Sequence, residues 1–247
     1  MGNSVEITRD DFIIEIGPGL GTLTKRLIER AGEVIAIELD TRMIKILENR
    51  FKNCENFSII NNDILQVDLK SIIEEKRKKY NNVKVVANLP YYITTPIIMK
   101  LLEEKLEIDS ITVMVQKEVA DRITAIPGKK NSGAITYSVY YYSIPSKIVF
   151  VPKQCFIPSP EVDSEVIQLK IRKEPCINVK DENLFFKIVK SSFMQRRKTL
   201  INGLVNSNII KSKEEAIEIL EKLNLEKNIR GDILSIEEFA KITNMLS

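Results

Sequence analysis

The chain has 247 residues, of which 44% are hydrophobic and 29% are charged, and its formal net charge is +3 at pH 7. This length and composition are typical of a globular protein with one α/β domain and a small appended domain. No run reaches the roughly 18 apolar residues that a membrane span needs and no secretory signal opens the chain, so we expect a cytoplasmic protein without a membrane partner.

Two residue types limit the chemistry. Histidine is absent, which excludes catalysis by Ser-His or Cys-His pairs and removes the commonest metal ligand. The three cysteines, Cys54, Cys155 and Cys176, are widely spaced and form no CxxC motif. They are typical of reduced thiols in a cytoplasmic protein, and we expect no metal site.

Hydrophobic runs and helical patterns alternate from Phe12 onward. We predict strands at 12–16, 34–37, 57–61, 83–87 and 110–116. The helices between and after them are predicted at 22–31, 41–52, 69–78, 95–104 and 117–125. Such alternation predicts an α/β fold, in which a mostly parallel sheet carries helices on both faces.

Three further strands are predicted, near 135–142, 146–151 and 164–172. The last strands are joined without a helix, which suggests a hairpin that adds one antiparallel strand to the sheet. The first of the three contains four tyrosines, which we expect to pack rather than to stack on bases: Tyr137, Tyr140, Tyr141 and Tyr142.

From Asp181 the pattern changes to helices alone, at 182–193, 196–206, 212–223 and 235–246. Glu174, Pro175 and Asn178 mark a linker before them. We therefore divide the chain into an α/β domain of residues 1–175 and a small all-α domain of residues 176–247.

A glycine-rich turn follows the first predicted strand. Glu15 precedes it, and Gly17, Gly19 and Gly21 allow a ligand to approach the backbone where a helix with unpaired N–H groups begins. The dinucleotide fingerprint reads G-x-G-x-x-G, whereas here the third glycine comes one residue early. The motif favours a nucleoside ligand without a pyrophosphate, such as S-adenosylmethionine, although a structural glycine turn is the alternative for the motif alone.

Acidic residues end the next two predicted strands. Glu38 lies about twenty positions beyond the glycines, where it could accept both hydroxyls of a ribose. Asp63, followed by Ile64, ends the third strand and could accept a hydrogen bond from an adenine amine. Solvated carboxylates are the alternative for each acid alone, but their order along successive strands favours one binding site.

The fourth predicted strand ends in Asn88, Leu89, Pro90 and Tyr91. The Asn88 side-chain oxygen and the nearby backbone carbonyls are acceptors, and the tyrosine offers a ring face beside them. This arrangement suits a planar base with an exocyclic amine, and an ordinary strand-to-helix turn is the alternative. Asn88 also belongs to the predicted cofactor site.

With these motifs, the chain resembles the rRNA adenine N6,N6-dimethyltransferase family of the KsgA type, from about Asp11 to the C-terminus. The resemblance is carried by EIGPGLGTLT at 15–24, IELD at 37–40, NDIL at 62–65, NLPYYITTPI at 88–97, VQKEVADRI at 115–123, CFIPSPEVDS at 155–164 and FMQRRKTL at 193–200. It implies a Rossmann-like S-adenosylmethionine-dependent methyltransferase domain followed by a helical RNA-contact domain. It further implies dimethylation of N6 on two adjacent adenosines near the 3′ end of small-subunit rRNA, and a role in small-subunit maturation.

The chemistry implied by the resemblance needs little acid–base catalysis. The N6 lone pair of adenine is delocalised, and acceptors on both N–H groups would favour a tetrahedral nitrogen. We expect the Asn88 oxygen and the carbonyl of Leu89 or Pro90 to be those acceptors, with Pro90 stiffening the turn. Tyr91 would stack on the extruded base, and the resemblance suggests Phe156 as a second aromatic contact.

Positive charge is concentrated between Lys170 and Lys213, where eleven Lys and Arg face three acids. The centre of this block is Arg196, Arg197 and Lys198, which we predict to contact rRNA in the small subunit or its precursor. A solvated helix face is the alternative. For a second basic run, residues 76–79, RNA contact and an exposed helix end are equally favoured. We expect a monomer.

One departure from the family concerns the N-terminus. The resemblance implies a preceding segment with a Gln-Asn-Phe-Leu-like motif that closes over the methionine part of the cofactor. The chain reaches its first strand by about Phe12 without that motif, so we expect an incomplete cofactor site and impaired activity in this chain.

Three other functions are compatible with parts of the sequence. One is a large-subunit rRNA adenine N6-methyltransferase of the antibiotic-resistance type, against which the residues after the Asn-Leu-Pro-Tyr core argue. Another is a non-catalytic rRNA-binding assembly factor. The third, a DNA N6-adenine methyltransferase, would typically carry Asp-Pro-Pro-Tyr in place of Asn-Leu-Pro-Tyr.

Overall fold

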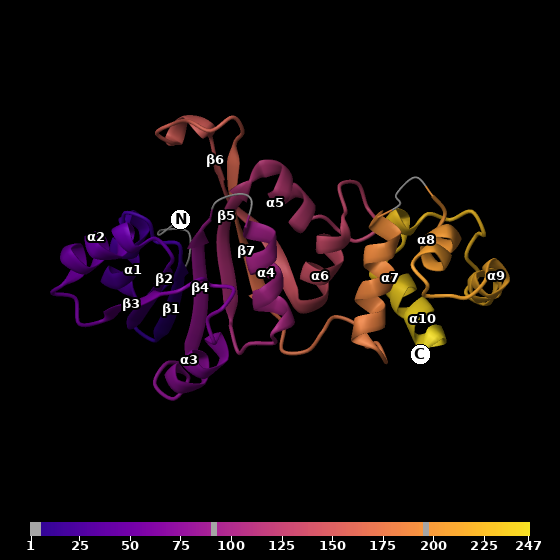
Figure 1. Ribbon diagram of the computed structural model, residues 1–247, viewed down its shortest axis with the longest axis horizontal. Helices are drawn as coiled ribbons and strands as arrows, with labels where there is room; N and C mark the ends of the chain where they lie inside the picture. Colours follow the sequence, from indigo (N-terminus) through magenta and orange to yellow (C-terminus); the bar gives the residue numbers. More distant parts are fainter. Residues whose placement is uncertain (1–5, 90–92, 195–197) are drawn as a thin grey trace. The chain divides into compact units, whose positions relative to one another are not determined.

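A computed structural model describes residues 6–89, 93–194 and 198–247, which form a seven-stranded sheet and two groups of helices (Figure 1). The strands are β1 (Asp11–Ile16), β2 (Glu33–Glu38), β3 (Phe57–Asn61), β4 (Asn82–Asn88), β5 (Ser110–Gln116), β6 (Ser143–Val151) and β7 (Ser164–Ile171). The α-helices are α1 (Thr22–Arg30), α2 (Thr41–Phe51), α3 (Leu69–Lys76), α4 (Thr94–Glu103), α5 (Lys117–Ile123), α6 (Ala134–Tyr142), α7 (Glu182–Met194), α8 (Leu200–Asn206), α9 (Lys213–Lys222) and α10 (Ile236–Leu246). Two short 3-10 helices are η1 (Lys153–Cys155) and η2 (Gly231–Ile233).

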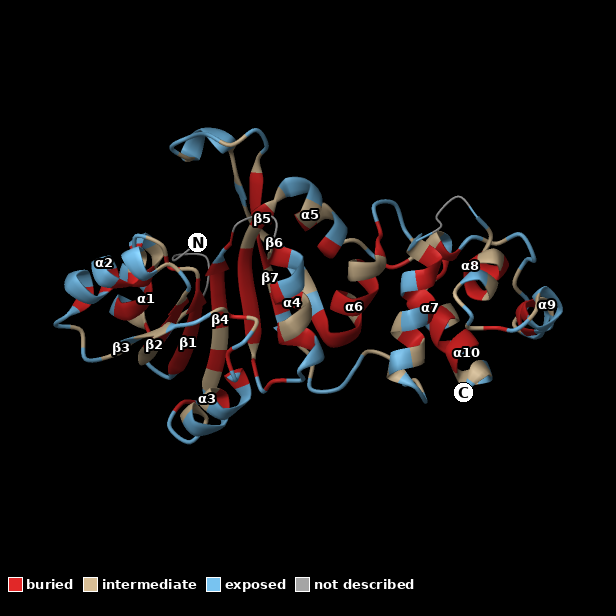
Figure 2. Ribbon diagram, in the orientation of Figure 1, coloured by how far each residue is buried: buried red, intermediate tan, exposed pale blue. Residues whose placement is uncertain are grey.

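The sheet has the strand order β3-β2-β1-β4-β5-β7-β6. The first five strands in this order are parallel, and β7 runs antiparallel to β5. All six residues of β1 are buried (Figure 2), as expected for a central parallel strand covered on both faces. The predicted α/β class and the antiparallel strand are therefore confirmed.

The direction of winding reverses between β1 and β4. Because crossover connections are right-handed, the helices that link β1 to β3 lie on one face of the sheet and those that link β3 to β5 lie on the other. On the first face, α1 and α2 pack on β1 and β4 through Ile13, Leu27, Leu47 and Val86. Open α/β sheets bind ligands at such a reversal, beyond the carboxyl ends of the strands.

The predicted strand at 135–142 is wrong, because residues 134–142 form α6. Tyrosine, valine and threonine favour strands when packing is left out of account, but tertiary contacts override that preference. Tyr137 is fully buried, and its ring lies 5.5 Å from Phe193 and 5.1 Å from Phe239. Its hydroxyl donates to the Leu234 carbonyl at 2.5 Å. Tyr137, and likewise Tyr141 and Tyr142 against α7, therefore pack as expected, but they do so from a helix.

The chain forms two compact units, residues 1–120 with 144–172 and residues 121–143 with 173–247. The first is the sheet unit and the second the helical unit. Segment 121–143 thus belongs with the C-terminal helices, which a single boundary at residue 175 does not capture. The division into a methyltransferase domain and an RNA-contact domain stays a prediction, because compactness alone does not assign function.

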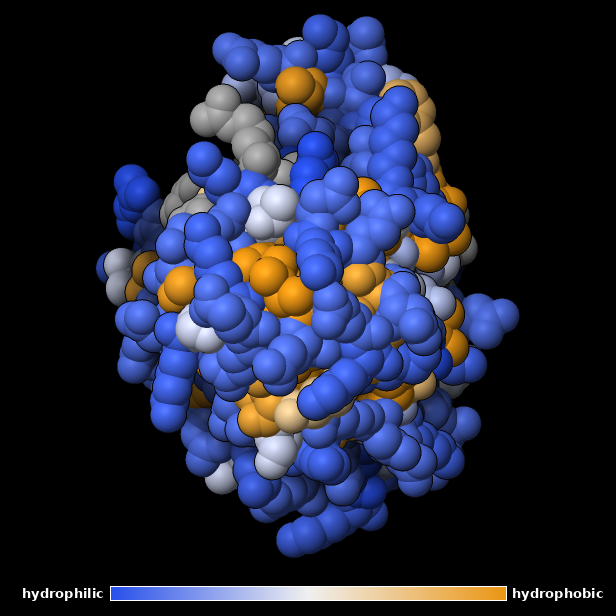
Figure 3. All heavy atoms as spheres, turned by 90° about the vertical axis from the view of Figure 1, so that its right-hand side faces the viewer, coloured by the Kyte–Doolittle hydropathy of each residue, from blue (hydrophilic) through white to orange (hydrophobic). Residues whose placement is uncertain are grey.

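The helical unit is built on α7 and α10. Phe185 and Ile188 of α7 and Phe239 of α10 are fully buried, while the face of this unit in Figure 3 is largely hydrophilic. In the part of the chain that the structure describes, no helix is both long and apolar enough to cross a membrane.

Ser235 caps the start of α10. Its hydroxyl accepts from the Glu238 backbone N–H at 3.2 Å, and the Glu238 carboxylate accepts from the Ser235 N–H at 2.7 Å. This reciprocal pair satisfies two donors that the helix leaves unpaired. It also fixes the start of the helix that carries Phe239 into the core.

We predict that Ser235→Ala lowers the free energy of unfolding of the helical unit by about 1 kcal/mol, because the cap is lost. Urea unfolding followed by circular dichroism measures the change. Ser235→Asn is the matched control, since asparagine also caps helices and should retain most of the stability. Equal loss in both variants would show that the cap is not the cause.

Candidate functional site

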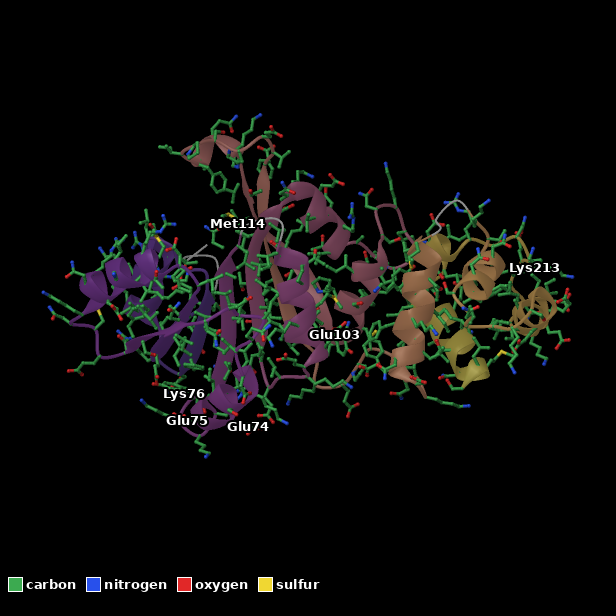
Figure 4. All side chains as sticks on the ribbon, viewed as in Figure 1. Glu74, Glu75, Lys76, Glu103, Met114 and Lys213 are labelled. Carbon is green, nitrogen blue, oxygen red and sulfur yellow. The ribbon has the colours of Figure 1, made fainter. Side chains whose placement is uncertain are left out.

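The carboxyl ends of five neighbouring strands meet at one level of the sheet. In the observed register, Glu38 pairs with Asn61 and Asn88 pairs with Met114. Ile16, the last residue of β1, pairs with Ile37 on one side and with Ala87 on the other, so that Gly17 follows at the level of Glu38 and Asn88. Figure 4 marks Met114 near the end of β5.

Three predicted site residues project from the same face of the sheet. Glu15 pairs with Ala36 and Val86, which precede Glu38 and Asn88 by two positions. Side chains two residues apart on a strand share a face. Glu15, Glu38 and Asn88 therefore point to the face that α1 covers, and the register brings them to one site.

The glycine turn divides into two parts. Gly17 and Gly19 have positive φ angles of 67° and 55°, and a β-carbon on Gly19 would meet no atom of the described residues within 4 Å. Gly21 also has a positive φ, but a β-carbon there would lie 2.7 Å from Leu47 and Phe51 of α2. Gly19 therefore faces open space, whereas Gly21 is required for packing. Cofactor binding by all three glycines stays a prediction.

The Gly17 turn lies beside the Asn88 turn. A β-carbon on Gly17 would stand 3.7 Å from the Leu89 side chain and 3.9 Å from the Asn88 carbonyl oxygen. The Gly17 N–H donates to the Ile37 carbonyl at 3.0 Å. A β-carbon at these distances would make ordinary van der Waals contact, so glycine is favoured here by its positive φ angle and not by lack of space.

Glu38 is held by backbone donors on both of its carboxylate oxygens. Oε2 accepts from the Gly19 N–H at 3.2 Å, and Oε1 accepts from the N–H groups of Leu39 and Asp40 at 2.9 and 3.0 Å. Asn61, which the sequence analysis did not select, donates to the Glu38 carbonyl at 3.0 Å. The carboxylate is thus positioned at the glycine turn before any ligand arrives.

Glu15 lies beneath the turn and is only 1% exposed. The pKa of this carboxyl is raised to about 7: burial is the main cause, the Thr24 hydroxyl offsets part of the rise, and the charge on Glu38 adds to it. The Thr24 hydroxyl lies near enough to affect this pKa but falls outside hydrogen-bond geometry, so among the described residues neither Glu15 Oε2 nor Thr24 Oγ1 has a hydrogen-bond partner. A buried oxygen without a partner can accept a donor from a ligand.

The third strand end carries Asp63 and Ile64. The Asp63 Oδ1 accepts from the Leu65 N–H at 2.9 Å, and the Asp63 N–H donates to the Asn62 side chain at 2.8 Å. Asp63 is half-buried and Ile64 is buried. Both follow β3 on the same edge of the sheet as Glu38, and a role for them in binding adenine stays a prediction.

The predicted catalytic segment is described in part. Asn88 is exposed at the end of β4 and Leu89 is buried, while Pro90 and Tyr91 lie outside the described residues. Phe156 is half-buried in the loop between β6 and β7. The Lys117 N–H donates to the Asp163 carbonyl at 3.0 Å, which ties the end of that loop to the end of β5.

The predicted RNA contacts lie in the helical unit. Lys198 is exposed, and Arg196 and Arg197 lie outside the described residues. None of the described residues form a group of three or more acidic or cysteine side chains that could hold a metal ion.

The basic run at residues 76–79 begins with two cations that bind within the sheet unit. Lys76, marked at the end of α3 in Figure 4, lies 2.7 Å from the Glu33 carboxylate. Arg77 pairs with Asp109 at 2.7 Å and donates to the Glu107 carbonyl, also at 2.7 Å. These contacts engage Lys76 and Arg77 within the sheet unit, whereas Lys78 and Lys79 are exposed, so neither RNA contact nor an exposed helix end is favoured for the run as a whole.

Comparison with known proteins decides the family. The sequence model of "Ribosomal RNA adenine dimethylase" matches residues 3–242. The chain belongs to that family. It is 51% identical to the ribosomal RNA small subunit methyltransferase A of Lachnoclostridium phytofermentans over 245 residues, which cover 98% of this chain and 84% of that protein. The protein of the same name in Clostridioides difficile is 47% identical, with 99% and 84% covered.

Two solved structures are similar over nearly the whole chain. A dimethyladenosine transferase from Plasmodium falciparum has a TM-score of 0.79 at 25% identity, with 97% of this chain and 91% of that chain covered. The 23S rRNA methyltransferase ErmE has a TM-score of 0.71 at 22% identity, with 99% and 94% covered. The second likeness concerns the fold alone.

The buried carboxyl of this dimethylase-family protein should make its stability depend on pH. The pKa of Glu15 is about 7 in the folded protein against an ordinary value of 4.5. The folded state therefore binds more protons than the unfolded state between about pH 4.5 and 7. The contribution of Glu15 to stability is present below this window and is lost as the pH rises through it.

We predict that Glu15→Gln, which cannot ionise, is more stable than the wild type at pH 8 by up to about 3 kcal/mol and gains nothing near pH 4.5. Urea unfolding at the two pH values measures the difference. Glu48→Gln, at an exposed position on α2, is the control and should keep the wild-type pH profile. A gain of equal size at both pH values would contradict the assignment.

Proposed function

We propose that this protein is an S-adenosylmethionine-dependent methyltransferase that dimethylates N6 of two adjacent adenosines near the 3′ end of small-subunit rRNA. The observation that carries the proposal is the alignment of Glu38, Gly17 and Asn88 at the edge where the sheet reverses direction. The proposal is also supported by a relative that is 51% identical to this chain and is named a ribosomal RNA small subunit methyltransferase.

The residues at this edge fit the cofactor. Gly19 borders open space, Glu38 presents a carboxylate already oriented by backbone N–H groups, and Glu15 offers a buried oxygen that lacks a partner. We assign the ribose hydroxyls to Glu38, as in other nucleotide-binding sheets of this kind. Asp63 and Ile64 follow the next strand and would contact the adenine ring of the cofactor.

Negative charge at this edge suits the cofactor, which carries a sulfonium and an ammonium group. S-adenosylmethionine supplies an electrophilic methyl group on sulfur. The charge on Glu38 and the ionised form of Glu15 would attract these cations, and the neutral form of Glu15 would attract them less. Cofactor affinity should therefore weaken as the pH falls below about 7, where Glu15 takes up a proton.

Asn88 is the residue to which we assign the reacting adenine. Its side chain is exposed at the end of β4, beside the Gly17 turn. The Asn88 Oδ1 would accept one N6–H of the substrate, and the backbone carbonyl of Leu89 or Pro90 would accept the other. Both acceptors hold the nitrogen in the geometry that directs its lone pair out of the ring plane. After transfer, the extra proton passes to water.

Aromatic contacts to the substrate base are assigned to Tyr91 and Phe156. The loop that contains Phe156 is closed by its own hydrogen bonds, in which Ser159 donates to the Lys153 carbonyl and Lys153 donates to Asp163, both at 2.9 Å. A loop fixed in this way loses little conformational entropy when a base stacks on it. The substrate base must leave its own stack to reach this site.

The proposed partner is small-subunit rRNA, free or in a precursor particle, bound by a monomer in the cytoplasm. Arg196, Arg197 and Lys198 are assigned to its phosphate backbone. Mass determination in solution tests the monomer, and cell fractionation tests the location.

We predict that this chain, given S-adenosylmethionine, forms dimethyladenosine in undermethylated small-subunit particles, even at the reduced rate expected from its sequence, and forms none in large-subunit particles. Asn88→Ala should lower the rate about 100-fold, because one of the two acceptors on the reacting amine is lost. Mass spectrometry of the digested rRNA measures both results.

Asn53→Ala is the matched control. Asn53 is an exposed asparagine between the end of α2 and the start of β3, whereas the candidate site lies at the carboxyl ends of the strands. It should leave the rate unchanged. Methylation of large-subunit rRNA would contradict the proposed substrate and would favour a methyltransferase of the antibiotic-resistance type. Activity of Asn88→Ala near the wild-type rate would remove Asn88 from the mechanism.

A further inference from the structure

Three chain segments meet around η2 in the helical unit. They are residues 126–132, residues 198–200 and residues 229–234, and we call their exposed side the η2 surface. The Leu200 N–H donates to the Ile229 carbonyl at 2.8 Å. A β-carbon on Gly231 would lie 2.3 Å from the Ser192 side chain, so η2 is pressed against the end of α7.

Gly128 seats the first segment on η2. Its φ angle is +76°, and a β-carbon there would lie 2.8 Å from the carbonyl oxygens of both Ile233 and Leu234. Only glycine tolerates this conformation and this close approach without strain. The loop between α5 and α6 is thereby brought next to the carboxyl end of α7 (Figure 1).

Two turns shape the tip of this loop. The Lys129 N–H donates to the Ile126 carbonyl at 3.0 Å, and the Ser132 N–H donates to the Lys129 carbonyl at 3.1 Å. The Ser132 hydroxyl also donates to the Asp232 carbonyl at 3.4 Å. Lys129 and Lys130 are exposed at the tip, so the loop presents two adjacent cations on a fixed backbone.

Charge on the η2 surface is mostly positive. Lys129, Lys130 and Lys198 are exposed, and the one carboxylate in the three segments, Asp232, is paired with Arg230 at 2.6 Å. Apolar side chains lie between the cations: Ile126 is 62% exposed and Ile233 is 58% exposed. Cations beside apolar groups suit a polymer whose phosphates alternate with sugars and bases.

We propose that the η2 surface binds the sugar-phosphate backbone of the substrate rRNA, and that Lys129 and Lys130 contact its phosphates. The proposal rests on the proposed function and extends it, because these lysines lie outside the basic block between residues 170 and 213. Lys198, which belongs to that block, precedes Leu200 by two residues, and the hydrogen bond from Leu200 to Ile229 places its segment beside η2. Two segments that are far apart in the sequence thus bring exposed lysines to the η2 segment.

Binding of the double variant Lys129→Ala/Lys130→Ala to protein-free small-subunit rRNA tests the proposal. Affinity is measured at several salt concentrations. Each lost phosphate contact lowers the slope of log affinity against log salt by about 1, so the double variant should show a slope about 1 to 2 smaller than the wild type. Its affinity at low salt should also fall.

The matched control is Lys222→Ala/Lys227→Ala, which removes the same charge from two exposed lysines of the helical unit that lie outside the three segments of the η2 surface. It should keep the wild-type slope. An unchanged slope in the Lys129/Lys130 variant overturns the proposal. So does a variant that binds protein-free rRNA normally and fails only on whole particles, because a ribosomal protein would then be the partner. Methylation by the wild-type chain tests the proposed function independently.

Discussion

The pairing of β1 with β2 on one side and β4 on the other is the constraint on which the site depends. Ile16 stands opposite Ile37 and Ala87, so the residues that follow the three strands reach the same level. A slip of one residue in either pairing would turn Glu38 or Asn88 to the opposite face of the sheet. The backbone register therefore determines the positions of the side chains in the candidate site.

Much of this edge could be predicted from the sequence, since buried parallel strands are continuous hydrophobic runs whose ends are easily located. Glu15, Glu38 and Asn88 were selected on that basis, and the register brings them together. The state of Glu15 could not be predicted. Its raised pKa depends on burial beneath the turn and on the charge of Glu38, which are properties of the packed structure. The chemical roles of these residues stay predictions.

Segment 134–142 shows where local sequence fails. Its tyrosines favour a strand, yet Tyr137 and Tyr141 find partners such as Phe239 and Phe185 far along the chain, and the segment is helical. Basic runs are ambiguous for a similar reason. Lys76 and Arg77 bind acidic and carbonyl groups of their own unit, whereas Lys129 and Lys130 are exposed. The number of charged residues in a run can be read from the sequence, but whether each of them is exposed to solvent depends on the packed structure.

The antiparallel course of β7 has a consequence for the edge of the sheet that carries the candidate site. Ser164, its first residue, pairs with Gln116, the last residue of β5, so the chain enters β7 at the rim where the other strands leave the sheet. A parallel strand would begin at the far rim and would need a crossover to return. Reversing a single strand therefore places an extra loop, which contains η1 and Phe156, at the edge where the parallel strands end, and no α-helix lies between β6 and β7.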